Sequence, residues 1–425
     1  MSDGFKLETL ALHGGQEIDV TKARAVPLHR TTAYLFDDTK HAADLFALKE
    51  LGNIYTRLMN PTQDVLEKRM AEIEGGVGAL ALSSGTAAIH YSILNVCRQG
   101  DEIVASKYLY GGTYTMLNDI LPQYGIKTTF VDIHNLDEVR AAITDKTRAV
   151  FTEVIGNPVL DVADIAALAD IAHDNDLPLM VDSTFTPPSI FRPIEHGADV
   201  VIHSLTKWIG GHGTAIGGIV VDAGKFDWTK PKFANFNEPD SSYHGVRYAH
   251  DLGPLTPLAF ILRMRLVPLR NLGSCISPDN SWIALQGLET LSLRMERHSE
   301  NGLKVAKYLQ AHENVSWVKY PGLEGDQGYD LAKKQFGDLC GGMVVFGIKG
   351  GIAKGADFIN SLKLLSHVAN VGDAKSLAIH PASTTHSQMS DDQQEDGGIG
   401  SELIRLSIGI EHIDDILADI SQALS

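Results

Sequence analysis

The chain has 425 residues, of which 44% are hydrophobic and 21% are charged, as expected for a globular protein with two or three domains. Its formal net charge of −17 argues against nucleic acid or an anionic membrane as a partner.

Targeting signals and the spacing of cysteines further narrow the classes of protein to which this chain could belong. No apolar run reaches the length of about 20 residues that a membrane-spanning helix needs. The N-terminal segment lacks the basic and apolar regions of a secretory signal, so we expect none. The cysteines Cys97, Cys275 and Cys340 lie far apart, which argues against a disulfide framework or a zinc site and favours a reducing, cytoplasmic environment.

Residues 1–60 are predicted to form an N-terminal arm, in which only residues 42–51 have clear helical periodicity. A helix capped by Thr62 is expected to run to Glu74 and to stop at Gly75 and Gly76. An arm of this length packs either on its own domain or on a neighbouring molecule.

Short apolar segments alternate with helical patterns between residues 77 and 222. This alternation predicts a mainly parallel sheet that is covered by helices on both faces. We expect its strands at 79–82, 101–106, 127–132, 147–154, 177–181, 200–203 and 218–221. Sites in such sheets lie outside the carboxyl ends of the strands, where Ser84, Glu153, Asp182 and the run Ser204–Lys207 would meet.

The alternation breaks at residues 223–276, which we interpret as an insertion crossing the surface, with a short helix near 258–265. A long helical region from 278 to 311 is expected to be interrupted at Gly287 and Gly302. The remaining pattern predicts a smaller α+β domain with strands near 315–320, 342–346, 376–379 and 403–408 and helices near 356–365 and 413–424. Residues 390–401 are acidic and glycine-rich, which favours a mobile loop.

Lys207 is the residue with the most unusual surroundings. It follows a buried strand, Ser204 and Thr206 precede it, and a glycine-rich loop that permits close approach to a ligand comes after it. A lysine in a desolvated site loses proton affinity and becomes a nucleophile toward an aldehyde. We therefore interpret Lys207 as the holder of a cofactor aldehyde through a Schiff base, although a lysine in this position taken alone is usually just exposed.

Other candidates have plain structural alternatives. Asp182 at a strand end either caps a turn or pairs with a protonated ring nitrogen. Ser84, Gly85 and Thr86 open a helix, which is either a simple cap or an anion site. Tyr110 either packs or stacks on a flat ring.

Arg57 and Arg405 could each clamp a carboxylate or phosphate, since the guanidinium fork matches both groups. Because Arg405 lies inside an apolar strand, an internal ion pair is the alternative.

Other cofactor motifs are absent from the sequence. The glycines between 211 and 217 are one residue out of register with the dinucleotide fingerprint, and the sequence has no Walker A loop, no GxSxG elbow and no HExxH pair. We expect no metal site.

Several segments, in order along nearly the whole chain, resemble the pyridoxal-phosphate-dependent enzymes of cysteine and methionine metabolism. They are YTRLMNPT (55–62), LSSGTA (82–87), YGGT (110–113), Asn157-Pro158, VDSTF (181–185), HSLTKWIGG (203–211), HPASTTHS (380–387) and RLSIGIE (405–411). Within that family the sequence looks most like the O-acetylhomoserine sulfhydrylases (homocysteine synthases), because of its length, its 223–276 insertion and Gly112, where methionine γ-lyases carry a cysteine.

The resemblance implies a fold type I α/β architecture with a seven-stranded, mainly parallel sheet. It also implies an N-terminal arm (1–60) that contacts a neighbouring subunit, a cofactor-binding large domain (61–290, including the insertion) and a C-terminal α+β domain (291–425). The subunits are expected to form a cytoplasmic homotetramer built from dimers that share active sites.

Residue roles follow from the same resemblance. Lys207 would bind pyridoxal 5′-phosphate and move protons, Asp182 would pair with the ring nitrogen, and Tyr110 would stack on the ring and assist proton transfer. The phosphate would be held by Gly85, Thr86, Ser204 and Thr206, with Tyr55 and Arg57 from the neighbouring subunit. Arg405 would bind the substrate carboxylate, with Asn157 near the ring hydroxyl and Asn370, where many relatives carry serine, near that carboxylate.

The expected reaction is replacement at Cγ of O-acetyl-L-homoserine by sulfide, giving L-homocysteine and acetate. Three alternatives remain open from the sequence: γ-elimination of the methionine γ-lyase kind, transfer with another thiol or acyl-homoserine, and a catalytically silent cofactor-binding or scaffold protein. The combination of Lys207, Asp182, Tyr110 and Arg405 argues against the last.

Overall fold

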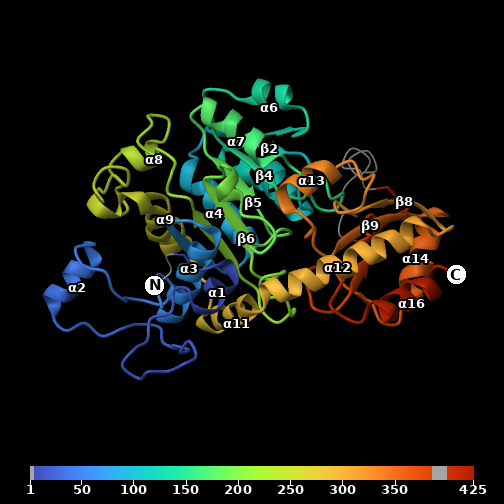
Figure 1. Cartoon of the computed structure of the whole chain (residues 1–425). Helices are drawn as coiled ribbons and strands as arrows, with labels where there is room; N and C mark the ends of the chain where they lie inside the picture. The colour runs from blue at the N-terminus through green and yellow to red at the C-terminus, as the bar shows by residue number, and fades with distance from the viewer. Residues whose placement is uncertain (1–3, 385–399) are drawn as a thin grey trace.

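The computed structural model describes residues 4–384 and 400–425 and contains two β-sheets, with a long helix that runs from the region of the larger sheet toward the smaller one (Figure 1). Most of the predicted 390–401 loop and the end of the HPASTTHS segment lie outside the described residues. Within those ranges no helix combines the length and apolar character needed to cross a membrane.

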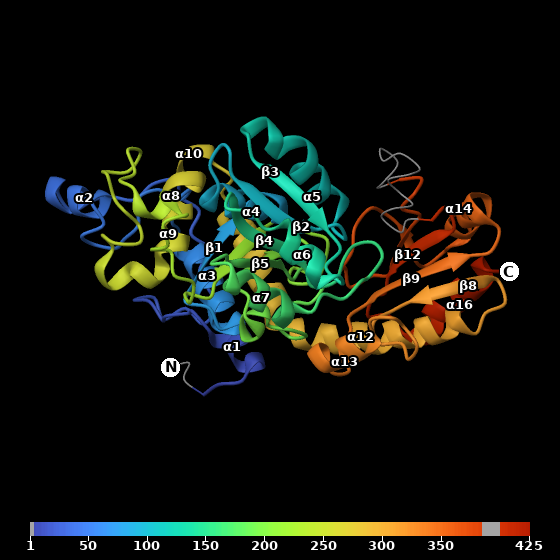
Figure 2. The same ribbon diagram turned by 90° about the horizontal axis from the view of Figure 1, so that it is seen from above.

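The larger sheet has seven strands in the order β1-β7-β6-β5-β4-β2-β3, which confirms the expected seven-stranded, mainly parallel architecture (Figure 2). Strand β7 runs antiparallel to both of its neighbours, and the other pairs are parallel. The strands are β1 (Gly78–Leu82), β2 (Glu102–Ser106), β3 (Lys127–Val131), β4 (Thr147–Glu153), β5 (Leu179–Asp182), β6 (Val200–Ser204) and β7 (Gly218–Asp222).

Helices cover both faces of this sheet because successive apolar residues of each strand point to opposite sides. In β4, for example, Val150 joins the core on one face and Phe151 the core on the other. Helices α3 and α7 contact one face, and α4 and α9 the other. The helical elements of this part are α3 (Pro61–Glu74), α4 (Gly85–Val96), α5 (Gly111–Thr115), η1 (Met116–Ile120), η2 (Leu121–Tyr124), α6 (Leu136–Ala142), α7 (Ile165–Asp174) and η3 (Pro193–His196).

The cap of α3 corrects one sequence expectation. Asn60, not Thr62, is the N-cap: its side chain accepts a hydrogen bond from the Thr62 backbone N–H, and Pro61 occupies the first helical position. The Thr62 hydroxyl instead donates to the Pro27 carbonyl at 2.8 Å and so fastens the arm to α3.

The arm contains two helices rather than one. Helix α1 (Leu7–His13) packs on α3 and α11, while α2 (Thr39–Phe46) lies well away from both sheets (Figures 1 and 2). Helix α2 begins three residues before the predicted 42–51 range and ends five residues short of its end; the Asp38 side chain caps it by accepting from the His41 N–H.

The 223–276 segment packs more deeply than a surface crossing. Its aromatic side chains Trp228, Phe233, Phe236 and Phe260 are buried and join the core beside α4. The polar residues between them gave the segment its surface-like pattern. Its helical elements are α8 (Ala234–Asn237), η4 (Gly253–Leu258), α9 (Ala259–Met264), η5 (Arg265–Leu269) and α10 (Arg270–Leu272).

Helices α11 (Pro278–Glu289) and α12 (Leu291–Gln310) separate at Thr290, so the predicted interruptions at Gly287 and Gly302 were wrong. Both glycines are helical and serve close packing instead. A Cβ atom at Gly287 would lie 2.2 Å from the Ile209 carbonyl oxygen, and one at Gly302 would lie 2.8 Å from the Gly341 carbonyl oxygen.

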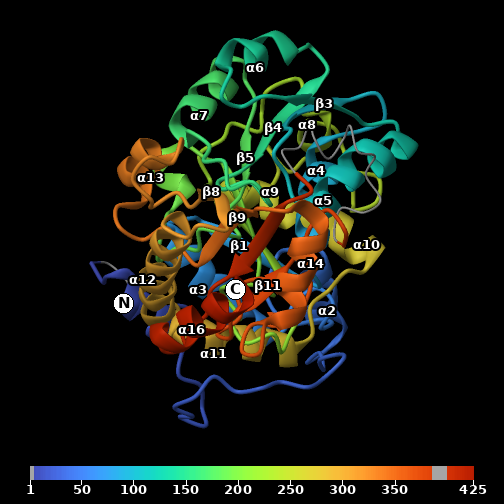
Figure 3. The same cartoon turned by 90° about the vertical axis from the view of Figure 1, so that its right-hand side faces the viewer.

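The smaller sheet has the order β10-β11-β12-β9-β8 and is flanked by α12, α14 and α16 (Figure 3). The expected strands and the two expected helices are present, whereas β10 and α13 were not predicted. The elements are β8 (Val315–Lys319), α13 (Tyr329–Phe336), β9 (Met343–Ile348), α14 (Gly351–Ser361), β10 (Ser366–His367), β11 (Leu377–Ile379), β12 (Leu403–Ser407) and α16 (Ile413–Ala423).

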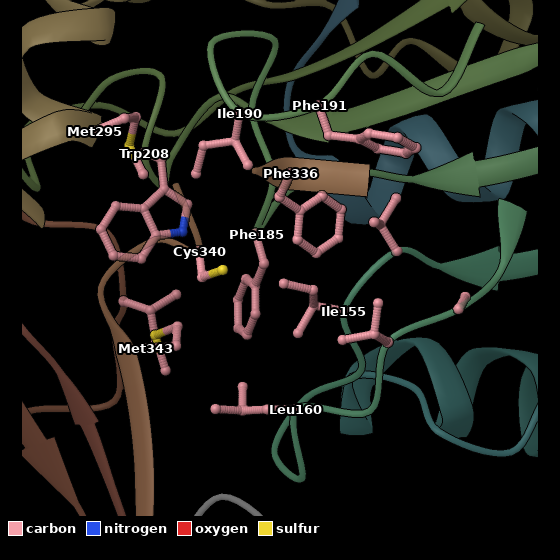
Figure 4. Close-up of a cluster of buried hydrophobic side chains, with 14 of the residues drawn as sticks. Ile155, Leu160, Phe185, Ile190, Phe191, Trp208, Met295, Phe336, Cys340 and Met343 are labelled. Carbon is pink, nitrogen blue, oxygen red and sulfur yellow. The ribbon is translucent and has the colours of Figure 1, made fainter. Parts of the chain in front are cut away.

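A buried cluster that includes Trp208, the residue after Lys207, joins the two sheet regions (Figure 4). Trp208 is fully buried and meets the His298 ring edge-on at 4.8 Å between centroids. Met295 from α12 and Met343 from β9 lie beside it in the close-up, with Phe185 from the loop after β5. The residue that follows Lys207 is therefore anchored in the core that connects the two regions.

Candidate functional site

A cavity of about 390 Å³ opens at the carboxyl ends of β4, β5 and β6, where the sequence placed the site. It brings together residues from both sheet regions. Its lining includes the sequence-predicted residues Gly85, Thr86, Tyr110, Asn157, Asp182, Ser204, Thr206, Lys207, Asn370 and Arg405, together with Ser84 and Glu153.

Lys207 is held at the centre of this lining. Its Nζ donates a hydrogen bond to Asn370 Oδ1 at 2.7 Å. On one side, the hydroxyl of Thr206 accepts from the Gly217 N–H at 3.1 Å, and on the other side Trp208 is buried in the core. Burial, and secondarily the nearby Arg405 guanidinium, lower the pKa of Lys207 to about 8. The amine is thereby prepared to attack an aldehyde at a pH where an exposed lysine is protonated.

Asp182 ends β5 and presents a carboxylate to the cavity. Its Oδ1 accepts a hydrogen bond from the Thr184 N–H at 2.9 Å, so Asp182 does cap a turn, as one of the two interpretations of the sequence expected. This contact is compatible with the other interpretation, pairing with a ring nitrogen. Among the described residues no lysine, arginine or histidine forms an ion pair with it. Burial raises the pKa of Asp182, while the Thr184 hydrogen bonds oppose that shift. A cationic ring nitrogen would supply the missing counter-charge.

The amino end of α4 is a candidate anion site. Ser84 is the N-cap, and its hydroxyl accepts from the Ala87 N–H at 3.1 Å. Gly85 and Thr86, the first residues of the helix, line the cavity together with Ser204 and Thr206. A Cβ atom at Gly85 would lie 2.7 Å from Ser204 Cβ, so the two loops can only approach this closely with glycine there. Helix-terminal N–H groups and hydroxyls suit a phosphate.

Tyr110 lies on the loop before α5, half exposed, with its ring at the cavity. A Cβ atom at Gly112 would lie 2.6 Å from the Tyr110 ring. Any side chain at residue 112 would therefore displace the ring, which links the glycine that we noted in the sequence to the placement of the tyrosine.

Arg405 is 5% exposed in the middle of β12, and its internal ion-pair alternative fails. No carboxylate of the described residues lies within ion-pair distance of its guanidinium. Its Nη1 donates to Asn157 Oδ1 at 2.9 Å, and burial lowers the pKa of Arg405 to about 10. A buried guanidinium without an acidic partner is costly unless a ligand provides one.

The two asparagines contact residues that the sequence did not pair with them. Asn157, placed near the ring hydroxyl by the resemblance, is hydrogen-bonded to Arg405, and Asn370, placed near the substrate carboxylate, is hydrogen-bonded to Lys207. Both line the cavity, so their proposed roles toward ligands stay predictions.

Tyr55 and Arg57 are not brought to the cavity of their own chain. The Arg57 guanidinium lies 5.4 Å from the Tyr55 ring centroid and donates to the Arg270 carbonyl in the insertion. Tyr55 is 42% exposed. Both side chains therefore lie outside the cavity of their own chain, with Arg57 partly buried.

Sequence reasoning missed Thr184, which links two of the strand ends. Its N–H donates to Asp182, and its hydroxyl accepts from the Ser204 N–H at 2.8 Å. The available signal was its position two residues after an aspartate that ends a strand, where such turns form. Phe185 and Ile155, which form the apolar wall of the cavity, gave no signal beyond hydrophobicity.

The donor set fits pyridoxal 5′-phosphate. Lys207 suits the aldehyde, the unpaired Asp182 carboxylate suits the ring nitrogen, the amino end of α4 suits the phosphate, and Tyr110 offers a flat face. Four different elements provide these four groups to one cavity.

The lowered pKa of Lys207 has a measurable consequence. The rate at which the cofactor-free protein attaches pyridoxal 5′-phosphate should rise with pH to a midpoint near 8 and then level off, because the neutral amine predominates above that pKa. Arg405→Gln should move the midpoint upward by removing a nearby positive charge, while Arg297→Gln, at a half-exposed position of α12, should not. Stopped-flow absorbance would measure the rate. An attachment rate that keeps rising above about pH 9 would contradict a lowered pKa of Lys207.

Comparison with known proteins agrees with this geometry. Residues 8–425 match the family of Cys/Met metabolism PLP-dependent enzymes. The chain is 54% identical to an O-acetyl-L-homoserine sulfhydrylase of Leptospira meyeri, with 100% of this chain and 98% of the relative covered. It is 50% identical to a homocysteine synthase of Schizosaccharomyces pombe, with 98% and 97% covered.

A crystal structure from Campylobacter jejuni, described as an O-acetylhomoserine (thiol)-lyase, superimposes with a TM-score of 0.96 at 40% identity. It covers 99% of this chain and 100% of its own and contains N′-pyridoxyl-lysine-5′-monophosphate. The chain accordingly belongs to the pyridoxal-phosphate-dependent enzymes of cysteine and methionine metabolism.

Proposed function

We propose that this enzyme replaces the acetate group of O-acetyl-L-homoserine with sulfide, giving L-homocysteine and acetate. The observation that carries the proposal is the cavity itself, in which a lysine of lowered pKa and a buried arginine without an acidic partner face the same space. A ligand carboxylate would give the arginine an acidic partner, and a ligand amino group could react with a cofactor aldehyde in place of the lysine amine. The names of the relatives from Leptospira meyeri and Schizosaccharomyces pombe favour the sulfhydrylase reaction over γ-elimination.

Bound pyridoxal 5′-phosphate supplies an electron sink that stabilises negative charge at the substrate carbons. The proposed cofactor contacts of this chain are Lys207 at the aldehyde, Asp182 at the ring nitrogen and Tyr110 on the ring face, with Asn157 in reach of the ring hydroxyl. Gly85, Thr86, Ser204 and Thr206 would hold the phosphate. Each role is supported by the position of its side chain or backbone at the cavity.

Arg405 would bind the substrate carboxylate through its planar fork. Asn157 already fixes one guanidinium nitrogen at 2.9 Å, which restricts the rotation of the fork before substrate arrives. Fixing the carboxylate would hold the substrate amine and Cα near Lys207, and a group held in place reacts far faster than one in solution.

Lys207 would also move protons, with its Nζ accepting the Cα proton of a substrate held by Arg405. The lowered pKa of Lys207, about 8 in this structure, favours that role at neutral pH. Asn370 Oδ1 can receive an N–H of the freed amine, as it does in the structure. Tyr110 lies on the same cavity wall and would assist further transfers.

A substrate panel tests the reaction. With sulfide present, O-acetylhomoserine should be used with kcat/KM about tenfold or more above O-succinylhomoserine and O-acetylserine, because pocket fit discriminates by such factors. Homocysteine and acetate should appear in equal amounts. Release of 2-oxobutyrate and ammonia from methionine at a comparable kcat/KM would instead assign the enzyme to γ-elimination.

We also propose that two chains share their sites, with Tyr55 and Arg57 of one chain reaching the phosphate end of the neighbouring cavity, and that dimers pair into a tetramer. The positions of Tyr55, which is exposed, and Arg57, which is partly buried, both outside the cavity of their own chain, support this arrangement. We further propose that the chain divides into a large domain (61–290) and a C-terminal domain (291–425). Cys97, Cys275 and Cys340 are free thiols, which supports a cytoplasmic location.

Subunit mixing tests the shared site. Lys207→Ala and Arg57→Ala variants should each be nearly inactive alone. Mixed after reversible dissociation, they should recover about a quarter of wild-type activity, because half of the dimers then hold one site with an intact lysine and an intact arginine. Mixing Lys207→Ala with Asp182→Ala is the matched control, and it should recover no activity. Failure of the first mixture, with exchange verified by mass spectrometry, would place Arg57 in its own chain's site or in none.

A further inference from the structure

Glu153 is a buried acid of the cavity that the proposed mechanism does not use. It ends β4 and pairs in register with Asp182, the last residue of β5. Because paired residues of parallel strands point to the same face, the two carboxyl groups emerge together at this edge of the sheet. Glu153 is 7% exposed, and both residues line the cavity.

The contacts of Glu153 join two loops. Its Oε1 accepts a hydrogen bond from the Tyr110 backbone N–H at 2.7 Å. The Asn157 backbone N–H is also near enough to this carboxyl to oppose the rise in the pKa of Glu153. Tyr110 is the proposed ring-stacking residue, and Asn157 fixes Arg405. One side chain therefore connects the loop at the cofactor face with the loop that orients the substrate-binding arginine.

The surroundings favour an uncharged Glu153. Among the described residues no lysine, arginine or histidine forms an ion pair with it. Burial, followed by the neighbouring Asp182 carboxylate, raises the pKa of Glu153 well above its ordinary range. The other titratable side chains that line the cavity are Tyr110, Lys207 and Arg405. A bound ring cation would further favour the charged form of Asp182 over that of Glu153.

We propose that Glu153 is a positioning residue that works as a neutral acid, tying the Tyr110 loop to the Asn157 loop and leaving the negative charge of the pair on Asp182. A second carboxylate here would add an unmatched charge to a buried site. The proposal rests on the proposed cofactor roles of Asp182 and Tyr110, and it does not depend on which thiol or acyl group the enzyme uses.

Glu153→Gln separates charge from geometry, since the amide keeps an acceptor for the Tyr110 N–H and is neutral. Spectroscopic pH titration of the lysine-bound cofactor should give a midpoint within about 0.3 unit of wild type, because no charge is lost. The cofactor dissociation constant should stay within about twofold. A midpoint lowered by about one unit or more would show that the substitution had removed a negative charge. That result would overturn the proposal that Glu153 is a neutral acid.

Glu153→Ala removes the acceptor. It should weaken cofactor binding about tenfold and change the visible spectrum, because the Tyr110 N–H loses its partner and the ring loses its support. Glu102→Gln, at the opposite end of neighbouring β2, is the matched control and should change neither. Unchanged cofactor affinity and spectrum in Glu153→Ala would overturn the positioning role. The spectroscopic result stands even if O-acetylhomoserine proves not to be the substrate, so the two proposals fail separately.

Discussion

Two cationic side chains, Lys207 and Arg405, share one buried cavity, and neither is ion-paired with a carboxylate of the described chain. Burial lowers the pKa of both side chains, and the nearby Arg405 guanidinium lowers that of Lys207 further. The carboxylate of an amino-acid substrate would pair with the Arg405 guanidinium. A cofactor aldehyde would react with the Lys207 amine and so remove its charge. The affinity of the site for its ligands therefore originates in charges that the fold itself leaves unsatisfied.

The fold holds Lys207 and Arg405 in place through the residues that pack next to them. Trp208 lies in the core that joins the two sheet regions, so Lys207 is placed by packing rather than by surface contacts. Arg405 belongs to β12 of the smaller sheet, and Asn157 to the loop after β4 of the larger one. Their 2.9 Å hydrogen bond crosses between the two regions, which makes the substrate end of the cavity sensitive to how these regions are packed together.

The sequence predicted the features that depend on local pattern. Apolar runs located the strands of the larger sheet, and strand ends located Asp182, Glu153 and Lys207. Features that depend on tertiary contact were missed or misplaced: Gly287 was read as a helix break, but it is the point where a backbone carbonyl approaches a helix. Phe236 and Phe260 were read as part of a surface crossing because the stacking that buries them involves residues far apart in the chain. The partners of Asn157 and Asn370 likewise follow only from the meeting of the two regions.

The central claim is that Lys207 is the residue that carries the cofactor. Borohydride reduction of the purified enzyme, followed by proteolysis and mass spectrometry, tests it directly by fixing the cofactor to whichever amine holds it. A pyridoxyl phosphate adduct is expected on the peptide that contains Lys207, in stoichiometric amount. An adduct on a different lysine, or an active enzyme that retains no adduct after reduction, would contradict it.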